Sequence, residues 1–108
     1  MEYVFCVRDP NGNGVALPSS RWQHIVDEHP NLASRLHDVR ETAEHPHVVQ
    51  VRDDAVNAEQ YRYYRRFGKG YVLLVVKEGK PRLIWTGWYC RRIRRGGRYE
   101  WLSIPDSR

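Results

Sequence analysis

The 108-residue sequence lacks long hydrophobic runs and contains only two cysteines. No apolar stretch reaches the roughly 18 residues that span a bilayer. The N-terminus shows no basic start followed by an apolar run, so we expect neither a membrane segment nor a signal peptide. Cys6 and Cys90 have no C-x-x-C spacing, which argues against a zinc framework. Both lie in apolar, strand-like surroundings where a buried, reduced thiol is ordinary, and this favours a cytoplasmic protein. A disulfide between them would instead point to export.

Internal repeats, low-complexity segments and linker-like stretches are also missing. The length is that of one domain, and a chain of this size buries about two-thirds of its unfolded surface. Hydrophobic residues make up 41% of the sequence, so the chain should fold rather than stay disordered. We therefore expect one domain over residues 1–108.

Acidic residues are scarce in the C-terminal half. Residues 60–108 contain 13 basic and 3 acidic residues, whereas residues 1–59 contain 5 basic and 10 acidic residues. Such asymmetry indicates an interaction surface. Lysine and arginine bind a polyanion favourably because counterions are released from it. Nucleic acid, and RNA above all, is therefore the leading partner class. The alternatives are a solvated basic face or a face covered by an acidic partner protein.

The N-terminal half predicts a hairpin followed by two helices. Strand-like residues 3–7 and 15–17 flank an Asn-Gly-Asn-Gly turn. Ser20 and Gln23 have the spacing of a capping box that opens a first helix, and Pro30 should end that helix. Asn31 can cap a second helix, which Pro46 should end. Its apolar stripe comprises Leu32, Leu36, Val39 and Ala43.

The pattern then changes to short strands. We expect strands near residues 48–51, 60–67, 71–76, 83–89 and 99–104, with a polar turn over residues 53–59. The connections among the later strands are too short for parallel crossovers, so they predict an antiparallel meander. The predicted fold class is α+β, with an N-terminal hairpin and two helices packed on one face of a four- to five-stranded antiparallel sheet.

Histidine is confined to residues 24–47. Because histidine titrates near neutral pH, the pair His24 and His29 on the first predicted helix is a candidate for proton transfer. The alternative is that His29 is a hydrogen-bonded residue at a helix end and that His24 is plain surface. The spacing is five rather than the four of a zinc-protease helix, and His45-Pro46-His47 has no evident third ligand, so we expect no metal and no cofactor.

Arginine and tyrosine alternate along residues 61–66. On a strand, Tyr61, Tyr63 and Arg65 should point one way and Arg62, Tyr64 and Arg66 the other. Guanidinium groups bind phosphate and tyrosines stack on unpaired bases, a combination typical of a single-strand platform. The alternative is an edge strand kept soluble by charge.

A second arginine cluster follows the Trp85–Trp88 segment. Five arginines within eight residues favour phosphate binding over a solvated turn; they are Arg91, Arg92, Arg94, Arg95 and Arg98. Before them, Thr86 offers a hydroxyl that could bind phosphate, and Gly87 would let a ligand approach closely. A threonine in a strand is otherwise simply a good strand former.

In this order, the motifs resemble the phage-associated branch of the barnase–EndoU–colicin–RelE nuclease superfamily. The resemblance covers most of residues 15–90 and rests on Trp22-x-His24-Ile25, His29-Pro30, Pro46, Tyr63-Tyr64-Arg65, the apolar strand after Tyr71, and Thr86-Gly87-Trp88. Where this chain has Thr86-Gly87-Trp88, the family often has Thr-Ala-aromatic. Members of the superfamily are small metal-independent ribonucleases, often toxins or effector domains.

The resemblance implies an active site on the sheet face near the helix pair, with His24, His29, Arg65 or a neighbour, and Thr86 as catalytic residues. RNA supplies its own 2′-hydroxyl nucleophile, so a general base, a general acid and preorganised cations suffice for cleavage. In this hypothesis Arg65 or Arg62 stabilises the phosphorane, and Thr86 with Tyr63 or Tyr64 positions the phosphate. The remaining substrate-binding candidates are Arg66, Lys69, Arg91, Arg92 and Arg94.

Two rival interpretations use the same basic face. A nucleic-acid-binding module without catalysis would leave the histidines structural. A protein-interaction domain would instead meet an acidic partner. A toxin combines ribonuclease activity with an acidic antitoxin or immunity protein that holds it in check.

Overall fold

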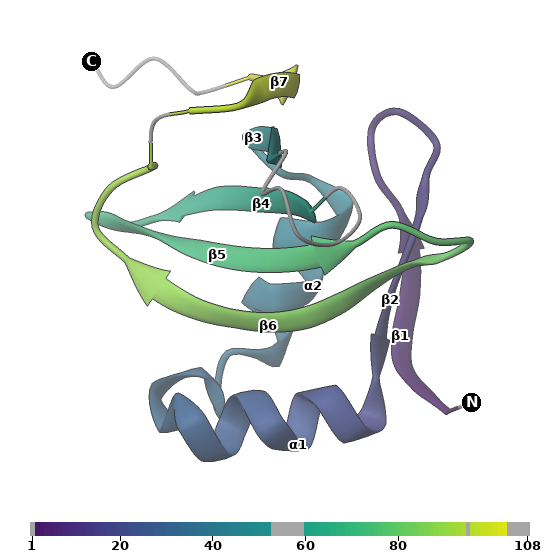
Figure 1. Cartoon of the computed structure of the whole chain (residues 1–108). Helices are drawn as coiled ribbons and strands as arrows, with labels where there is room; N and C mark the ends of the chain where they lie inside the picture. The colour runs from purple at the N-terminus through teal and green to yellow at the C-terminus, as the bar shows by residue number, and fades with distance from the viewer. Residues whose placement is uncertain (1, 53–59, 95, 104–108) are drawn as a thin grey trace.

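The computed structural model describes residues 2–52, 60–94 and 96–103. Within these ranges the chain forms one seven-stranded sheet and two helices joined by a 3-10 turn (Figure 1). The elements are β1 (Tyr3–Arg8), β2 (Gly14–Pro18), α1 (Ser19–Glu28), the turn η1 (Pro30–Leu32), α2 (Leu36–Glu44), β3 (Val48–Arg52), β4 (Gln60–Phe67), β5 (Gly70–Lys77), β6 (Arg82–Cys90) and β7 (Arg98–Leu102). None of the described helices is long and apolar enough to cross a membrane.

The α+β class is confirmed, but the predicted sheet of four to five antiparallel strands is wrong. The strand order is β1-β2-β6-β5-β4-β3-β7, and β2 runs parallel to β6. The predicted hairpin therefore extends the main sheet, through only two residue pairs, Val15 with Arg82 and Ala16 with Leu83. The last strand does not continue the meander either, because β7 pairs with β3 at the far edge.

Both helices begin at residues that the sequence did not indicate. α1 starts directly after Pro18, so Ser20 lies within the helix and cannot cap it, and no side chain caps this end. Gln23 Nε2 donates to Asp27 Oδ1 at 3.0 Å instead of closing a capping box. Asn31 lies in the 3-10 turn, and α2 begins only at Leu36. Both predicted ends, before Pro30 and Pro46, are confirmed.

The helices cover one side of the sheet. α2 lies behind β4 and β5, and α1 runs below β6 (Figure 1). The main core joins Ile25 and Val39 of the helices to Tyr63 and Leu74 of the strands. We call the side of β3–β6 that faces α2 the back face. The opposite side is the front face, whose strand residues include Val48, Gln50, Arg62, Tyr64, Leu73, Val75, Thr86 and Trp88.

A buried polar network on the back face joins elements from both ends of the sheet. Arg82 of β6 donates to both carboxylate oxygens of Glu100 at 2.8 and 3.0 Å and to the hydroxyl of Tyr63 at 2.8 Å. The Tyr63 hydroxyl donates to Asp9, whose carboxylate also accepts the backbone N–H groups of Asn11 and Asn13. Because β1, β4, β6 and β7 all border this network, it fixes how the hairpin and β7 approach each other.

Candidate nucleic-acid interface

One row of residues crosses the centre of the front face. Gln50 of β3 pairs with Arg62 of β4, Arg62 pairs with Val75 of β5, and Val75 pairs with Thr86 of β6. Paired residues on neighbouring strands point to the same side of a sheet, so these four side chains form one line. The strands β3–β6 contain no aspartate or glutamate at all. The row therefore holds an arginine with no acidic neighbour on its own strands.

Arg62 is buried, and two of its nitrogens have no hydrogen-bond partner among the described residues. The residue is 8% exposed, and neither Nε nor Nη1 has a hydrogen-bond partner. Gln50, directly opposite on β3, is fully buried, and its Oε1 also lacks a partner. Buried polar groups in proteins are almost always hydrogen-bonded, so an unpaired buried guanidinium is an exceptional feature.

The connection after β6 passes over the front face. Gln50 Nε2 donates to the backbone oxygen of Arg94, and the hydroxyl of Tyr64 accepts the backbone N–H of Arg94 at 3.3 Å. Ile93 packs against the front-face cluster of Val48, Tyr64 and Leu73. These contacts hold the backbone, while Arg91, Arg92 and Arg94 remain exposed. Arg95, the fourth arginine of the predicted cluster, lies outside the described residues.

His29 reaches the edge of the front face. It follows the last residue of α1, and its ring centroid lies 5.9 Å from that of Trp88. Trp88 packs on the front-face cluster, two residues beyond Thr86 on β6. His24 has a different environment, because its Nε2 lies 3.3 Å from Glu28 Oε2 on the partly exposed surface of α1. Five residues separate the two histidines, which corresponds to about 140° around a helix, so they do not project in the same direction.

Arg65 lies on the other side of the sheet from Thr86. It pairs with Val72, a back-face core residue, and its Nη1 donates to the backbone oxygen of His45 at 2.7 Å. That carbonyl follows the last residue of α2, where helices leave oxygens without intrahelical partners. Arg65 thus holds the end of α2, and the arginine that shares a face with Thr86 is Arg62. The alternation along β4 predicted these opposite directions but not which side the helices cover.

His47 stands beside Arg65 and accepts the backbone N–H of Arg66 at Nδ1, at 3.1 Å. Arg65 Nη1 lies 3.1 Å from Nε2 of the same ring. Burial lowers the pKa of His47, and the positive charges of Arg65 and Arg66 lower it further. A neutral imidazole at this position therefore supports the backbone between α2 and β3.

The tyrosines of β4 cannot stack on bases in this structure. Tyr63 and Tyr64 are both fully buried. Tyr63 belongs to the back-face network, where burial and the hydrogen bond to Asp9 raise its pKa. Tyr64 lies on the front face and anchors Arg94. Arg66 and Lys69 are exposed near the β4–β5 turn, where Arg66 Nε donates to the oxygen of Gly68 at 3.1 Å.

Sequence reasoning assigned no role to Trp85. This residue is 39% exposed, with the guanidinium carbon of Arg21 4.0 Å and Nζ of Lys77 3.8 Å from its ring centroid. Arg21 Nε also donates to the Trp85 backbone oxygen at 2.7 Å. Lys77 of β5 and Arg62 of β4 point to the same side of the sheet. Trp85 and Lys77 therefore form a second basic and aromatic group beside the row. Nothing in the spacing of Arg21 and Trp85 indicated this contact.

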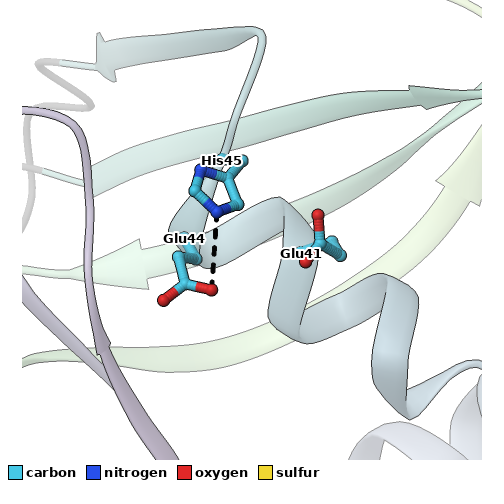
Figure 2. A group of neighbouring side chains, drawn as sticks. All are labelled: Glu41, Glu44 and His45. Carbon is cyan, nitrogen blue, oxygen red and sulfur yellow. Dashed lines mark ion pairs between the residues drawn. The ribbon is translucent and has the colours of Figure 1, made fainter.

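Among the described residues, one group could supply three metal ligands: Glu41, Glu44 and His45 at the end of α2 (Figure 2). His45 Nε2 lies 3.5 Å from Glu44 Oε1. His45 is exposed, and the group borders the exit from α2 rather than the row around Arg62. Groups of acidic side chains are common near protein surfaces without a metal, and we assign no metal here.

The sequence and the structure were compared with known proteins. No protein-family model matches the chain, and searches of curated proteins and of solved structures also give no match.

Proposed function

We propose that this protein binds RNA across its front face and cleaves it without a metal ion, as expected from the resemblance to the barnase–EndoU–colicin–RelE superfamily. The observation that carries the proposal is that Arg62 and Thr86 lie in one row on strands that contain no acidic residue, and that His29 contacts Trp88 on the same face. A surface of this composition attracts a polyanion and offers one histidine at its edge.

Binding would rest on the arginines rather than on the tyrosines. Arg91, Arg92 and Arg94 are exposed beside the row and can contact successive phosphates. Because the β4 tyrosines are buried, base stacking would fall to an exposed aromatic ring such as Tyr99, which is 51% exposed. The interface would therefore bind the RNA backbone with little base preference.

Cleavage would follow the usual transesterification. The 2′-oxygen bonds to phosphorus, its proton passes to a base, the bond to the 5′-oxygen breaks, and an acid protonates that oxygen. The products are a 2′,3′-cyclic phosphate and a 5′-hydroxyl. His29 would fill one proton-transfer role, and His24 remains the candidate for the other. The sequence left the stabilisation of the phosphorane charge to Arg65 or Arg62. Because Arg65 is bound to the end of α2, we assign this role to Arg62.

A binding module without catalysis is the second candidate. The observation that favours it is the separation of the histidines: His24 pairs with Glu28, and only His29 contacts a front-face residue. Such a module would bind RNA through the same arginines with a steep salt dependence. An acidic antitoxin or immunity protein would compete for the same surface.

A cleavage assay distinguishes these functions. Labelled single-stranded RNA and its all-DNA counterpart are incubated with the protein, with and without EDTA. We expect RNA cleavage that survives EDTA, spares DNA and leaves a 2′,3′-cyclic phosphate. His29→Ala should lower the rate about 10²- to 10⁴-fold, whereas His37→Ala, an exposed histidine of α2, should not. Binding without cleavage by the folded protein would contradict the ribonuclease proposal and leave the binding module.

A further inference from the structure

Arg62 is the most unusual charged residue among those described. Its side chain is central on the front face, it is more than nine-tenths buried, and Nε and Nη1 have no hydrogen-bond partner. A guanidinium carries five N–H donors and keeps its charge under all conditions in which proteins fold. Unlike a buried lysine or carboxyl group, it cannot escape the cost of burial by becoming neutral.

Among the residues that the structure describes, none accepts a hydrogen bond from Nε or Nη1 and so compensates this charge. Gln50 lies opposite and its Oε1 is an unpaired acceptor, yet an amide oxygen is neutral. Val75 on the other side is apolar. The backbone of Arg94 is hydrogen-bonded to Gln50 and Tyr64 on the same face, and the Arg94 side chain carries a further positive charge. A buried cation in such surroundings is stabilised chiefly by an anion from outside the chain.

We propose that Arg62 forms the floor of an oxyanion site that takes a phosphate group. A phosphate oxygen accepts charge-assisted hydrogen bonds from a guanidinium in a bidentate fork. Thr86 provides a hydroxyl on the same row, and Arg91, Arg92 and Arg94 stand at the margin of the face. The inference that this phosphate belongs to RNA rests on the proposed function; the capacity to bind free phosphate does not.

The site can be tested with inorganic phosphate alone. Thermal unfolding and calorimetric titration are followed in phosphate and, at matched ionic strength, in chloride. A ligand that binds only the folded state raises its stability by mass action. We expect phosphate, but not chloride, to raise the melting temperature of the wild-type protein. Arg62→Met should weaken phosphate binding at least roughly tenfold, whereas Arg40→Met, which removes an exposed arginine of α2, should not.

A second readout does not depend on the methionine variant folding. The arginine Nε–H signals of the wild-type protein are recorded by NMR during phosphate titration, and Arg62→Lys identifies the signal of Arg62 by its loss. A saturable shift of that signal supports the site. If the Arg62 signal does not shift with phosphate, or if wild type and Arg62→Met respond equally to phosphate, the proposed oxyanion site is wrong.

Titrations with different probes distinguish the possible sources of the phosphate. Inorganic phosphate, a short oligoribonucleotide, its DNA counterpart and a glutamate-rich peptide are titrated into the same preparations. Tighter, Arg62-dependent binding of the oligoribonucleotide supports RNA as the source. Arg62-dependent binding of the peptide without any phosphate response would overturn the oxyanion site in favour of an acidic protein. Absence of RNA cleavage together with Arg62-dependent phosphate binding would contradict the ribonuclease and support the site.

Discussion

Two buried arginines on opposite faces of one sheet have opposite surroundings. Arg82 and Arg62 are 6% and 8% exposed, so both are largely removed from water. Arg82 donates to both oxygens of Glu100 and to Tyr63, lies 3.7 Å from Asp9, and stacks over the ring of Tyr61. Within the described part of the chain, Arg62 has no ion-pair partner, and its Nε and Nη1 have no hydrogen bond.

The difference separates a structural group from a candidate binding group. Burial lowers the pKa of Arg82, but its hydrogen bonds to Glu100 and Tyr63 and the negative charge of Glu100 outweigh this and raise it. The chain itself thus stabilises the charge of Arg82. For Arg62 the described residues supply the burial without a counterion, which is the arrangement that a bound anion completes.

The largest effect should come from breaking the back-face network. Arg82→Met leaves Glu100 and Asp9 without their cation, and removing one member of a buried ion pair costs about 3–5 kcal/mol. Urea unfolding measures the loss. The matched variant is Arg62→Met, which should not lower the free energy of unfolding. Equal losses in the two variants would show that the two arginines are alike.

A smaller loss should separate Arg65 from Arg62 on the same strand. Arg65→Met removes the hydrogen bond to the His45 oxygen at the end of α2, which should cost about 1–3 kcal/mol of stability. Its effect on RNA affinity should be weaker than that of Arg62→Met, because Arg65 lies on the back face. Filter binding measures the RNA affinity of both variants. A larger loss of affinity in Arg65→Met than in Arg62→Met would show that Arg65 belongs to the RNA-binding site.

The division between the faces was only partly visible in the sequence. Alternation along residues 60–67 correctly predicted that Arg62 and Arg65 diverge, since side-chain direction in a strand is local. The covering of one face by α2 depends on tertiary packing, and so does the pairing of β2 with β6 through two residue pairs. His29 was recognised as a candidate, but its contact with Trp88 joins segments 59 positions apart in the sequence. The predicted polar turn over residues 53–59 lies outside the described residues.

The exposed arginines after β6 should affect salt dependence more than stability. Each phosphate contact of a single strand contributes about 0.7 to the slope of log affinity against log salt concentration. Arg91→Met, Arg92→Met and Arg94→Met should each reduce the slope by up to this amount and leave urea unfolding nearly unchanged. An unchanged slope in all three variants would remove this segment from the interface.

The smallest expected effect concerns pH. The pKa of His47 is lowered in the folded protein, so the unfolded chain binds the proton first as the pH falls. The stability that neutral His47 provides is therefore complete above its ordinary value of 6.5 and is lost as the pH falls through the lowered pKa. His47→Gln should flatten this decline in urea midpoint between pH 7.5 and 5.5, whereas the exposed His37→Gln should not.

The most direct test compares Arg62→Met with Arg82→Met for both stability and RNA affinity. Since Arg62 is proposed to bind a phosphate of RNA, Arg62→Met should unfold at the same or a higher urea concentration than the wild type. Its RNA affinity should nevertheless fall at least roughly tenfold. Arg82→Met should lose stability and, where it remains folded, retain RNA binding. An Arg62→Met variant that is destabilised and binds RNA as tightly as the wild type would contradict the central claim that Arg62 binds an external anion.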